Sequence, residues 1–330
     1  MDDLKKTVYN INMCHTNLNG SFLAFDRLTI QDVYNLSESK LNEIKTIFSL
    51  SNFELPITMG YNSLVFYANS NINSNVYKLA IKISVISKSD QSTLDLIHKL
   101  VSDNGISPKI FYDCIIDFKS RNFIIKLIMS ERVIPFTNFE WTSVIQMKKS
   151  ILTLIQKTLL LHSIGYVHND IKYENLGLDE KGNIYIFDFD NFDKITKLSC
   201  SKKYSSSVCH PPENLISSSI SHGLGNCIID LFSIVVIILG DIIKIRSWHF
   251  DNEQLYEKRA GITYFNRGRT HNLLQNIISK NFSTTCCSQF WYSLMNFIHL
   301  VFQKNIKIIN KRGFTVRSRK IIKRMQTDLD

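Results

Sequence analysis

One stretch constrains this chain more than any other: residues 167 to 192, "VHNDIKYENLGLDEKGNIYIFDFDNF". Within it, five polar residues lie inside a window of 21 positions: His168, Asp170, Lys172, Asn175 and Asp188. With each residue type at roughly one position in twenty, the spacing H-x-D-x-K-x-x-N arises by chance in well under about 1% of chains of this length. The pattern therefore predicts a functional loop whose carboxylates and amide converge on one point.

The residues on either side of this loop predict how it is held. Leu152, Ile155, Leu159 and His162 recur at helical spacing just before it. After it, the runs "NLGL" and "NIYIFDF" are joined by "DEKGN", which predicts a strand pair with Asp179 in the turn. The loop is thus expected between a helix and a hairpin.

The rest of the chain contains two regions with different sequence patterns. An amphipathic helix is expected near residues 36 to 50, capped by Asn35. Short β-rich runs then continue to residue 129, and one helix is expected from residue 92 to 102. Beyond residue 130 the pattern is mostly helical. These patterns predict an α+β protein with a β-rich N-terminal lobe and a larger, mostly α-helical C-terminal lobe.

Cysteine and hydropathy patterns indicate an intracellular, cytoplasmic protein. The seven cysteines are odd in number and form no C-x-x-C pair, so we expect neither a disulfide framework nor a zinc site. The N-terminus "MDDLKKTVYN" lacks the build of a secretory signal. The most apolar run, residues 231 to 240, has about half the length that spans a bilayer. We expect a reducing compartment and no transmembrane segment.

The positive charge is concentrated at one end of the sequence. Residues 301 to 330 contain nine Lys or Arg and two Asp, a net +7 out of the chain's +10. Such a basic tail attracts phosphates, either of a nucleic acid or of an anionic membrane surface. A solvated terminal helix or a frayed end accounts for the same residues. Both interpretations stay open at the level of the sequence.

The polar loop has the residue types that phosphoryl transfer needs. One carboxylate must accept or orient the acceptor hydroxyl, and a cation must lie beside the transferred phosphoryl group. Oxygen ligands must hold Mg²⁺. Asp170 is the candidate base, Lys172 the candidate cation, and Asn175 with Asp188 the candidate metal ligands.

These residues resemble the motifs of the eukaryotic-type protein kinase family. "HNDIKYEN" is similar to the catalytic loop H-R-D-L-K-x-x-N, and "DFD" (188 to 190) stands where the family has D-F-G. "LAIK" (79 to 82) resembles V-A-I-K, and "ITMGYNSLV" (57 to 65) lies where the glycine-rich loop is expected. Downstream, "PPE" (211 to 213) resembles A-P-E, and "DLFS" (230 to 233) the start of a buried helix.

The resemblance implies a bilobal kinase-like fold that binds ATP and Mg²⁺. It implies an N-terminal extension (1–52), a nucleotide-binding lobe (53–130), a catalytic lobe (131–300) and the basic tail (301–330). Lys82 would bind the α- and β-phosphates. The implied nucleotide-binding residues are Ile57, Gly60, Ser63, Val65, Ala80 and Lys82.

Four motifs depart from the family pattern. The glycine-rich loop keeps Gly60 but has Thr58 and Ser63 at the other two glycine positions, which predicts weaker nucleotide affinity. No glutamate follows Lys82 before residue 131, and Asp95 is the acid best placed to pair with it. Asn169 replaces the arginine that commonly binds an activation-segment phosphate, so we expect that switch to be missing. Asp190 replaces glycine and either caps the following turn or adds a carboxylate to the metal site.

Three functions remain compatible with these residues. The first is a divergent Ser/Thr protein kinase of viral or bacterial-effector type with unknown protein substrates, favoured by Lys172 and by the "HPPEN" segment. The second is a kinase-fold phosphotransferase that acts on a sugar, a lipid or another small molecule. The third is a pseudokinase that binds a partner without turnover. Retention of Lys82, Asp170 and Asp188 favours the two enzymes over the third.

Overall fold

The computed structural model of the chain divides into two compact units, Met1–Val133 (unit 1) and Ile134–Asp330 (unit 2). Each unit is described by itself. The described residues are 30–52, 58–60, 63–72, 75–116, 122–136, 140–179, 181–195, 226–242, 256–259, 262–265, 289–302 and 311–329.

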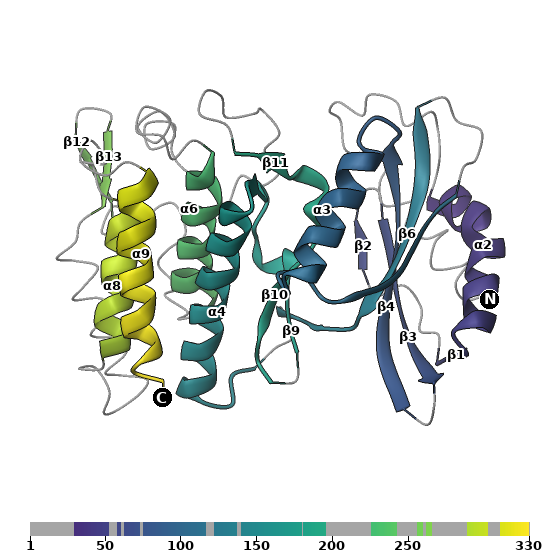
Figure 1. The fold of residues 1–330 in the computed structure, drawn as a ribbon, viewed down its shortest axis with the longest axis horizontal. Coiled ribbons are helices and arrows are strands. Elements are labelled where there is room, and N and C mark those ends of the chain that lie inside the picture. The colour runs from purple at the N-terminus through teal and green to yellow at the C-terminus, as the bar shows by residue number, and fades with distance from the viewer. Residues whose placement is uncertain are drawn as a thin grey trace. The chain divides into compact units, whose positions relative to one another are not determined.

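Unit 1 is built around a six-stranded antiparallel sheet (Figure 1). The strands run in the order β1-β3-β4-β6-β5. Both β1 and β2 pair with the same edge of β3, β2 at its start and β1 near its end. Ile, Val, Phe and Tyr are frequent in these strands, as expected for a pleated surface covered by helices. The strands are β1 (Leu50–Ser51), β2 (Thr58–Gly60), β3 (Ser63–Ile72), β4 (Asn75–Ser87), β5 (Ile110–Ile116) and β6 (Phe123–Glu131).

Two helices cover opposite faces of this sheet (Figure 1). On one face, α2 (Ile30–Ile47) buries Val33, Tyr34, Leu41 and Ile44 against inward-facing residues of β3, β4 and β6. On the other face lies α3 (Gln91–Asp103), whose Asp95 bonds to β6. Alternation along each strand separates the two faces, since successive side chains point in opposite directions.

The helix expected near residues 36 to 50 begins earlier than its sequence predicts. It starts at Ile30, so Asn35 lies inside the helix instead of capping it. Val33 and Tyr34 explain the difference, because both are buried in the sheet core and their packing stabilises the extra turn. The β-rich runs up to residue 129 and the helix expected from residue 92 to 102 are confirmed.

Unit 2 is mostly helical. The long helix α4 (Val144–Ser163) begins at Ser143, whose hydroxyl accepts the backbone N–H of Gln146 at 3.1 Å. Its other helices are α6 (Cys227–Ile237), continued by the π-helical turn η4 (Ile238–Ile242), α8 (Gln289–Phe302) and α9 (Lys311–Gln326). Its strands are β7 (Ile134–Pro135), β8 (Tyr166–Val167), β9 (Leu176–Leu178), β10 (Ile184–Ile186), β11 (Asp193–Lys194), β12 (Tyr256–Arg259) and β13 (Ile262–Phe265).

The hairpin predicted after the polar loop is confirmed. β9 pairs antiparallel with β10, with Leu178 opposite Ile184. In the turn, Asp179 accepts hydrogen bonds from the backbone N–H groups of Lys181 and Asn183. Asp179 is therefore a turn residue, as the sequence predicts. No helix among the described residues combines the length and apolar character that crossing a bilayer requires.

Candidate active site

The polar loop of unit 2 lies between β8 and the short 3-10 helix η2 (Tyr173–Asn175), and a buried aspartate holds its start. Asp230, in the first turn of α6, accepts the backbone N–H of His168 at 2.8 Å and that of Asn169 at 2.9 Å. It also bonds to Nε2 of His162, at the end of α4, at 3.0 Å. One carboxylate thus ties two helices to the loop.

His162 and Asp230 form an acid–base pair inside the unit. Burial by itself lowers the pKa of an imidazolium, but interactions with Cys227 and Asp230 raise the pKa of His162 to about 10. His162 is therefore protonated at neutral pH and compensates the Asp230 charge, which would otherwise be costly in an interior without solvent. The start of the loop is therefore bonded to an aspartate whose charge is balanced by His162.

His168 links the loop to the segment before Asp188. Its Nδ1 accepts the backbone N–H of Asp170 at 3.2 Å, which assigns the ring proton to Nε2. Nε2 then donates to the carbonyl oxygen of Phe187 at 3.0 Å. The ring also lies 4.7 Å from the buried ring of Phe189, measured between centroids. His168 is thus a buried residue that connects the Asp170 loop to the segment on both sides of Asp188.

Asp170 lies at the centre of the loop, and its two carboxylate oxygens differ. Oδ2 accepts a hydrogen bond from Lys172 Nζ at 2.8 Å and another from Asn175 Nδ2 at 3.2 Å. Oδ1 is buried and has no hydrogen-bond partner among the described residues. A buried acceptor without a partner is costly, and such atoms mark sites where a ligand group completes the bonding. Oδ1 is positioned to accept a proton from a bound group.

A backbone hydrogen bond holds the residue before Asp188 next to Asn175. The N–H of Phe187 donates to the carbonyl oxygen of Asn175 at 3.0 Å. Asp188 itself has a φ of 66°, a left-handed conformation that is uncommon for residues other than glycine. Because the amide nitrogen of Asn175 serves Asp170, its amide oxygen is the atom left to bind a cation. An amide oxygen and a carboxylate match Mg²⁺, which takes few protein ligands and keeps water or phosphate oxygens as the others.

Asn169 also has a left-handed backbone, with a φ of 65°. Its side-chain amide donates to the carbonyl oxygen of Asn191 at 3.0 Å. This bond connects the loop directly to the 3-10 turn η3 (Phe189–Asn191), without any phosphate. Asp190, in that turn, is exposed, and both of its expected roles stay predictions.

In unit 1, the described nucleotide-binding candidates share one sheet face. Lys82 on β4 is half-buried, with Val65 of β3 opposite it on one side and Ile128 of β6 on the other. Ala80 lies two residues earlier on β4, and therefore on the same face. Gly60 pairs with Ser63 across the β2–β3 hairpin. Ile57 lies outside the described residues, as does "HPPEN".

Asp95, the acid expected to face Lys82, pairs with a different lysine. It forms an ion pair with Lys126 of β6, and Asp113 of β5 lies 3.9 Å from the same ammonium. Lys126 is directly opposite Ser84, so it lies diagonally from Lys82 on the face covered by α3. The register of β4 and β6 brings Lys126 beneath the helix, which explains this pairing of Asp95.

Sequence reasoning missed Lys126, although the chain contains a signal for it. A lysine in the middle of the apolar run "FIIKLIM" cannot reach water easily from a covered strand and needs an acid beside it. Among the described residues, no group of three or more His, Cys, Asp or Glu could hold a metal by itself. The Asp170 loop is in unit 2 and Lys82 is in unit 1.

A scan against models of protein families found no match, and a search of curated proteins found no similar sequence.

Proposed function

We propose that this chain is a Ser/Thr protein kinase that transfers the γ-phosphoryl group of ATP to protein hydroxyls. The observation that carries the proposal is the asymmetry of Asp170. One oxygen is bonded to Lys172 and Asn175, and the other is buried with no hydrogen-bond partner among the residues that the structure describes. A general base needs this arrangement, because one oxygen is fixed while the other accepts the proton.

In this proposal, the acceptor hydroxyl binds at Asp170 Oδ1. Its oxygen forms a bond to the γ-phosphorus as the bond to the β,γ-bridging oxygen breaks, and its proton passes to Oδ1. Lys172 places a positive charge beside the transferred group, which favours the charge that develops there. Asn175 and Asp188 would hold Mg²⁺, which supplies charge neutralisation on the phosphates when bound.

The antiparallel sheet of unit 1, with α3 on the face that carries Lys82, supports its assignment as the small nucleotide-binding lobe. The largely helical unit 2 supports its assignment as the catalytic lobe. Cys114 and Cys227 are free thiols, which supports a reducing compartment.

The test measures transfer of label from γ-labelled ATP with Mg²⁺ to generic protein acceptors. Asp170→Ala should reduce labelling by about 10²–10⁴-fold, because it removes the proposed base. The matched control is Asp103→Ala at an exposed position of α3, which should leave labelling unchanged. Equal labelling by the wild type and Asp170→Ala would refute the proposal. Label that enters only a sugar or lipid pool would favour a small-molecule phosphotransferase.

A further inference from the structure

Residues 311–329 of the basic tail form a packed helix followed by a turn, and not a frayed end. Helix α9 buries Phe314, Ser318 and Met325 and packs against α8 and α4 (Figure 1). Just beyond it, Asp328 pairs at 2.9 Å with Lys148, a buried lysine of α4. The Lys148 ammonium also lies 5.4 Å from the ring centroid of Phe290 in α8. Lys148 therefore contacts both neighbouring elements and keeps α9 in place.

This packing leaves most of the basic side chains of α9 exposed. Five of its basic side chains are exposed, and none forms an ion pair with another described residue. Asp328, the acid next to them in the sequence, is already used by Lys148. The exposed basic residues are Arg317, Arg319, Lys320, Lys323 and Arg324.

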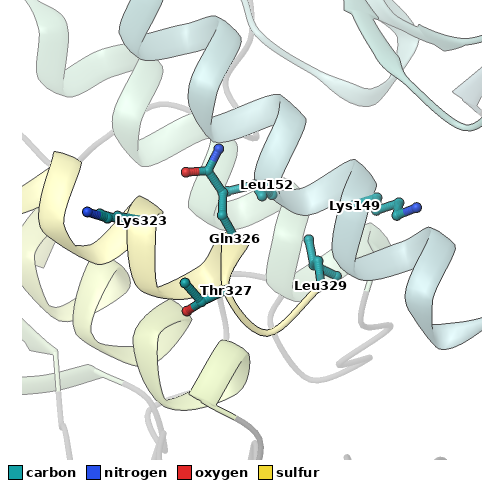
Figure 2. Close-up of a pocket in the computed structure, with 6 residues that line it drawn as sticks. All are labelled: Lys149, Leu152, Lys323, Gln326, Thr327 and Leu329. Atoms are coloured by element: carbon teal, nitrogen blue, oxygen red, sulfur yellow. The ribbon is translucent and has the colours of Figure 1, made fainter.

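A pocket of about 500 Å³ lies beside these residues, between α4 and the end of α9. Figure 2 shows Lys323 at one end and Lys149 at the other, with Leu152, Gln326 and Leu329 between them. Thr327 completes the lining. The pocket thus combines two leucines and two uncharged polar side chains with a lysine at each end.

We infer that this pocket and the exposed face of α9 bind an acidic peptide segment that carries one apolar side chain. The apolar side chain would enter between Leu152 and Leu329, and carboxylates on both sides of it would face Lys149 and Lys323. A small apolar anchor in a pocket, with complementary charges around it, is a common arrangement of specific peptide recognition.

The observations favour a peptide over the two other anionic partners. A nucleic acid has no aliphatic side chain for the pocket, and the described side chains of α9 include no exposed aromatic residue on which a base could stack. A membrane-surface helix needs an apolar face toward the lipid. Val316 is the single large apolar side chain exposed on the described part of α9. The inference goes beyond the proposed kinase activity and does not depend on it.

The experiment measures fluorescence anisotropy of a labelled peptide of Glu and Asp residues with one central Leu, added to the full chain. A second peptide has Ser in place of Leu. We expect the Leu peptide to bind in the micromolar range and about 5- to 10-fold more tightly than the Ser peptide. The double variant Lys149→Glu/Lys323→Glu should weaken binding of the Leu peptide by at least about 10-fold.

Two further variants separate the pocket from general charge attraction. Lys78→Glu/Lys99→Glu makes the same charge change at exposed positions of unit 1 and should leave binding within about 2-fold of the wild type. Thr327→Trp fills the pocket, so the two peptides should then bind equally. A thermal melt of each variant checks that it is folded.

Three results would overturn the inference. The first is equal binding of the Leu and Ser peptides to the wild type, which would indicate charge attraction alone. The second is an absence of binding up to about 200 µM peptide. The third is tighter binding, sensitive to Lys149→Glu/Lys323→Glu, of a DNA duplex or of vesicles of phosphatidylcholine and phosphatidylserine.

Discussion

Each unit of the molecule contains a lysine–aspartate pair, and the two pairs are buried in opposite ways. In unit 1 the lysine is buried and the acid is not, since the side chains of Lys126 and Asp95 are 1% and 37% exposed. In unit 2 the acid is buried, with Lys172 at 27% and Asp170 at 2%. In each pair, removal of the more exposed partner leaves the other charge buried without its compensation.

The bonding of the buried partner also differs between the pairs. Lys126 has Asp95 in contact and Asp113 at 3.9 Å, so its charge is compensated from two sides. Asp170 has a bonded oxygen and a second oxygen for which the described part of the chain supplies no partner. The first pattern is typical of a structural clamp between a helix and a sheet, and the second is typical of a site that reacts or binds. A buried ion pair indicates function only when its bonding is incomplete.

The largest expected effect on stability is in unit 1. Asp95→Ala leaves Lys126 buried with only the more distant Asp113, so the free energy of unfolding of unit 1 should fall by about 2–4 kcal/mol. Lys126→Met removes the buried charge itself and should cost about 1 kcal/mol or less. Hydrogen exchange of the amides of β4 and β6 measures both variants.

Tryptophan fluorescence provides the control for these variants. Trp141, Trp248 and Trp291 all belong to unit 2. The denaturation midpoint that they report should not change in either variant. A larger loss of protection in Lys126→Met than in Asp95→Ala would contradict the assignment of Lys126 as the buried, dependent partner.

In unit 2 we expect the lysine substitution to be more destabilising than the aspartate substitution, which is the reverse of the order in unit 1. Lys172→Met leaves the Asp170 carboxylate buried with only Asn175, and should lower the free energy of unfolding of unit 2 by about 1–3 kcal/mol. Asp170→Asn removes the charge and should change it by less than about 1 kcal/mol. Tryptophan fluorescence during urea denaturation measures both. If Asp170→Asn proved the more destabilising of the two, Asp170 would be a structural residue.

Much of the local structure of the site could be predicted from the sequence. Short β-rich runs predicted β4 and β6, and helical spacing predicted α4. The turn residues predicted the hairpin that brings Asp188 toward Asn175. These signals are local, because each depends on neighbours within a few residues.

The pairing partners could not be predicted in the same way. Asp95 pairs with Lys126 because of the register between β4 and β6, which is a long-range property of the sheet. The early start of α2 depends on the burial of Val33 and Tyr34 by strands that follow later in the chain. The partnerless Oδ1 of Asp170 is likewise a property of the folded loop.

The third pair, His162 with Asp230, is buried on both sides and should make stability depend on pH. The pKa of His162 is raised from 6.5 to about 10 in the folded chain, so folding favours its protonated form. Its contribution is complete below pH 6.5 and is lost as pH rises toward 10, by an amount on the order of 1 kcal/mol per pH unit. Urea denaturation between pH 6.5 and 8.5 should show this slope in the wild type and a flatter one in His162→Gln. Parallel slopes would show that His162 is neutral in the folded protein.

The smallest expected effect concerns the backbone beside Asp170. The clamp of unit 1 is built on a regular strand and helix, whereas Asn169 has a φ of 65°. Asn169→Ala and Asn169→Gly both lose the bond to the Asn191 carbonyl, but only alanine resists the left-handed conformation. Asn169→Ala should therefore be about 1 kcal/mol less stable than Asn169→Gly in urea denaturation monitored by tryptophan fluorescence.

The matched control for this difference is Asn104, at the end of α3, where φ is −90°. At that position glycine gains nothing from its freedom, so Asn104→Gly should be no more stable than Asn104→Ala. If alanine and glycine were equally stable at Asn169, the loop would relax out of the left-handed conformation when its side chain is removed. The rigidity of the Asp170 loop would then come from the side-chain bond of Asn169 to Asn191, and not from backbone geometry.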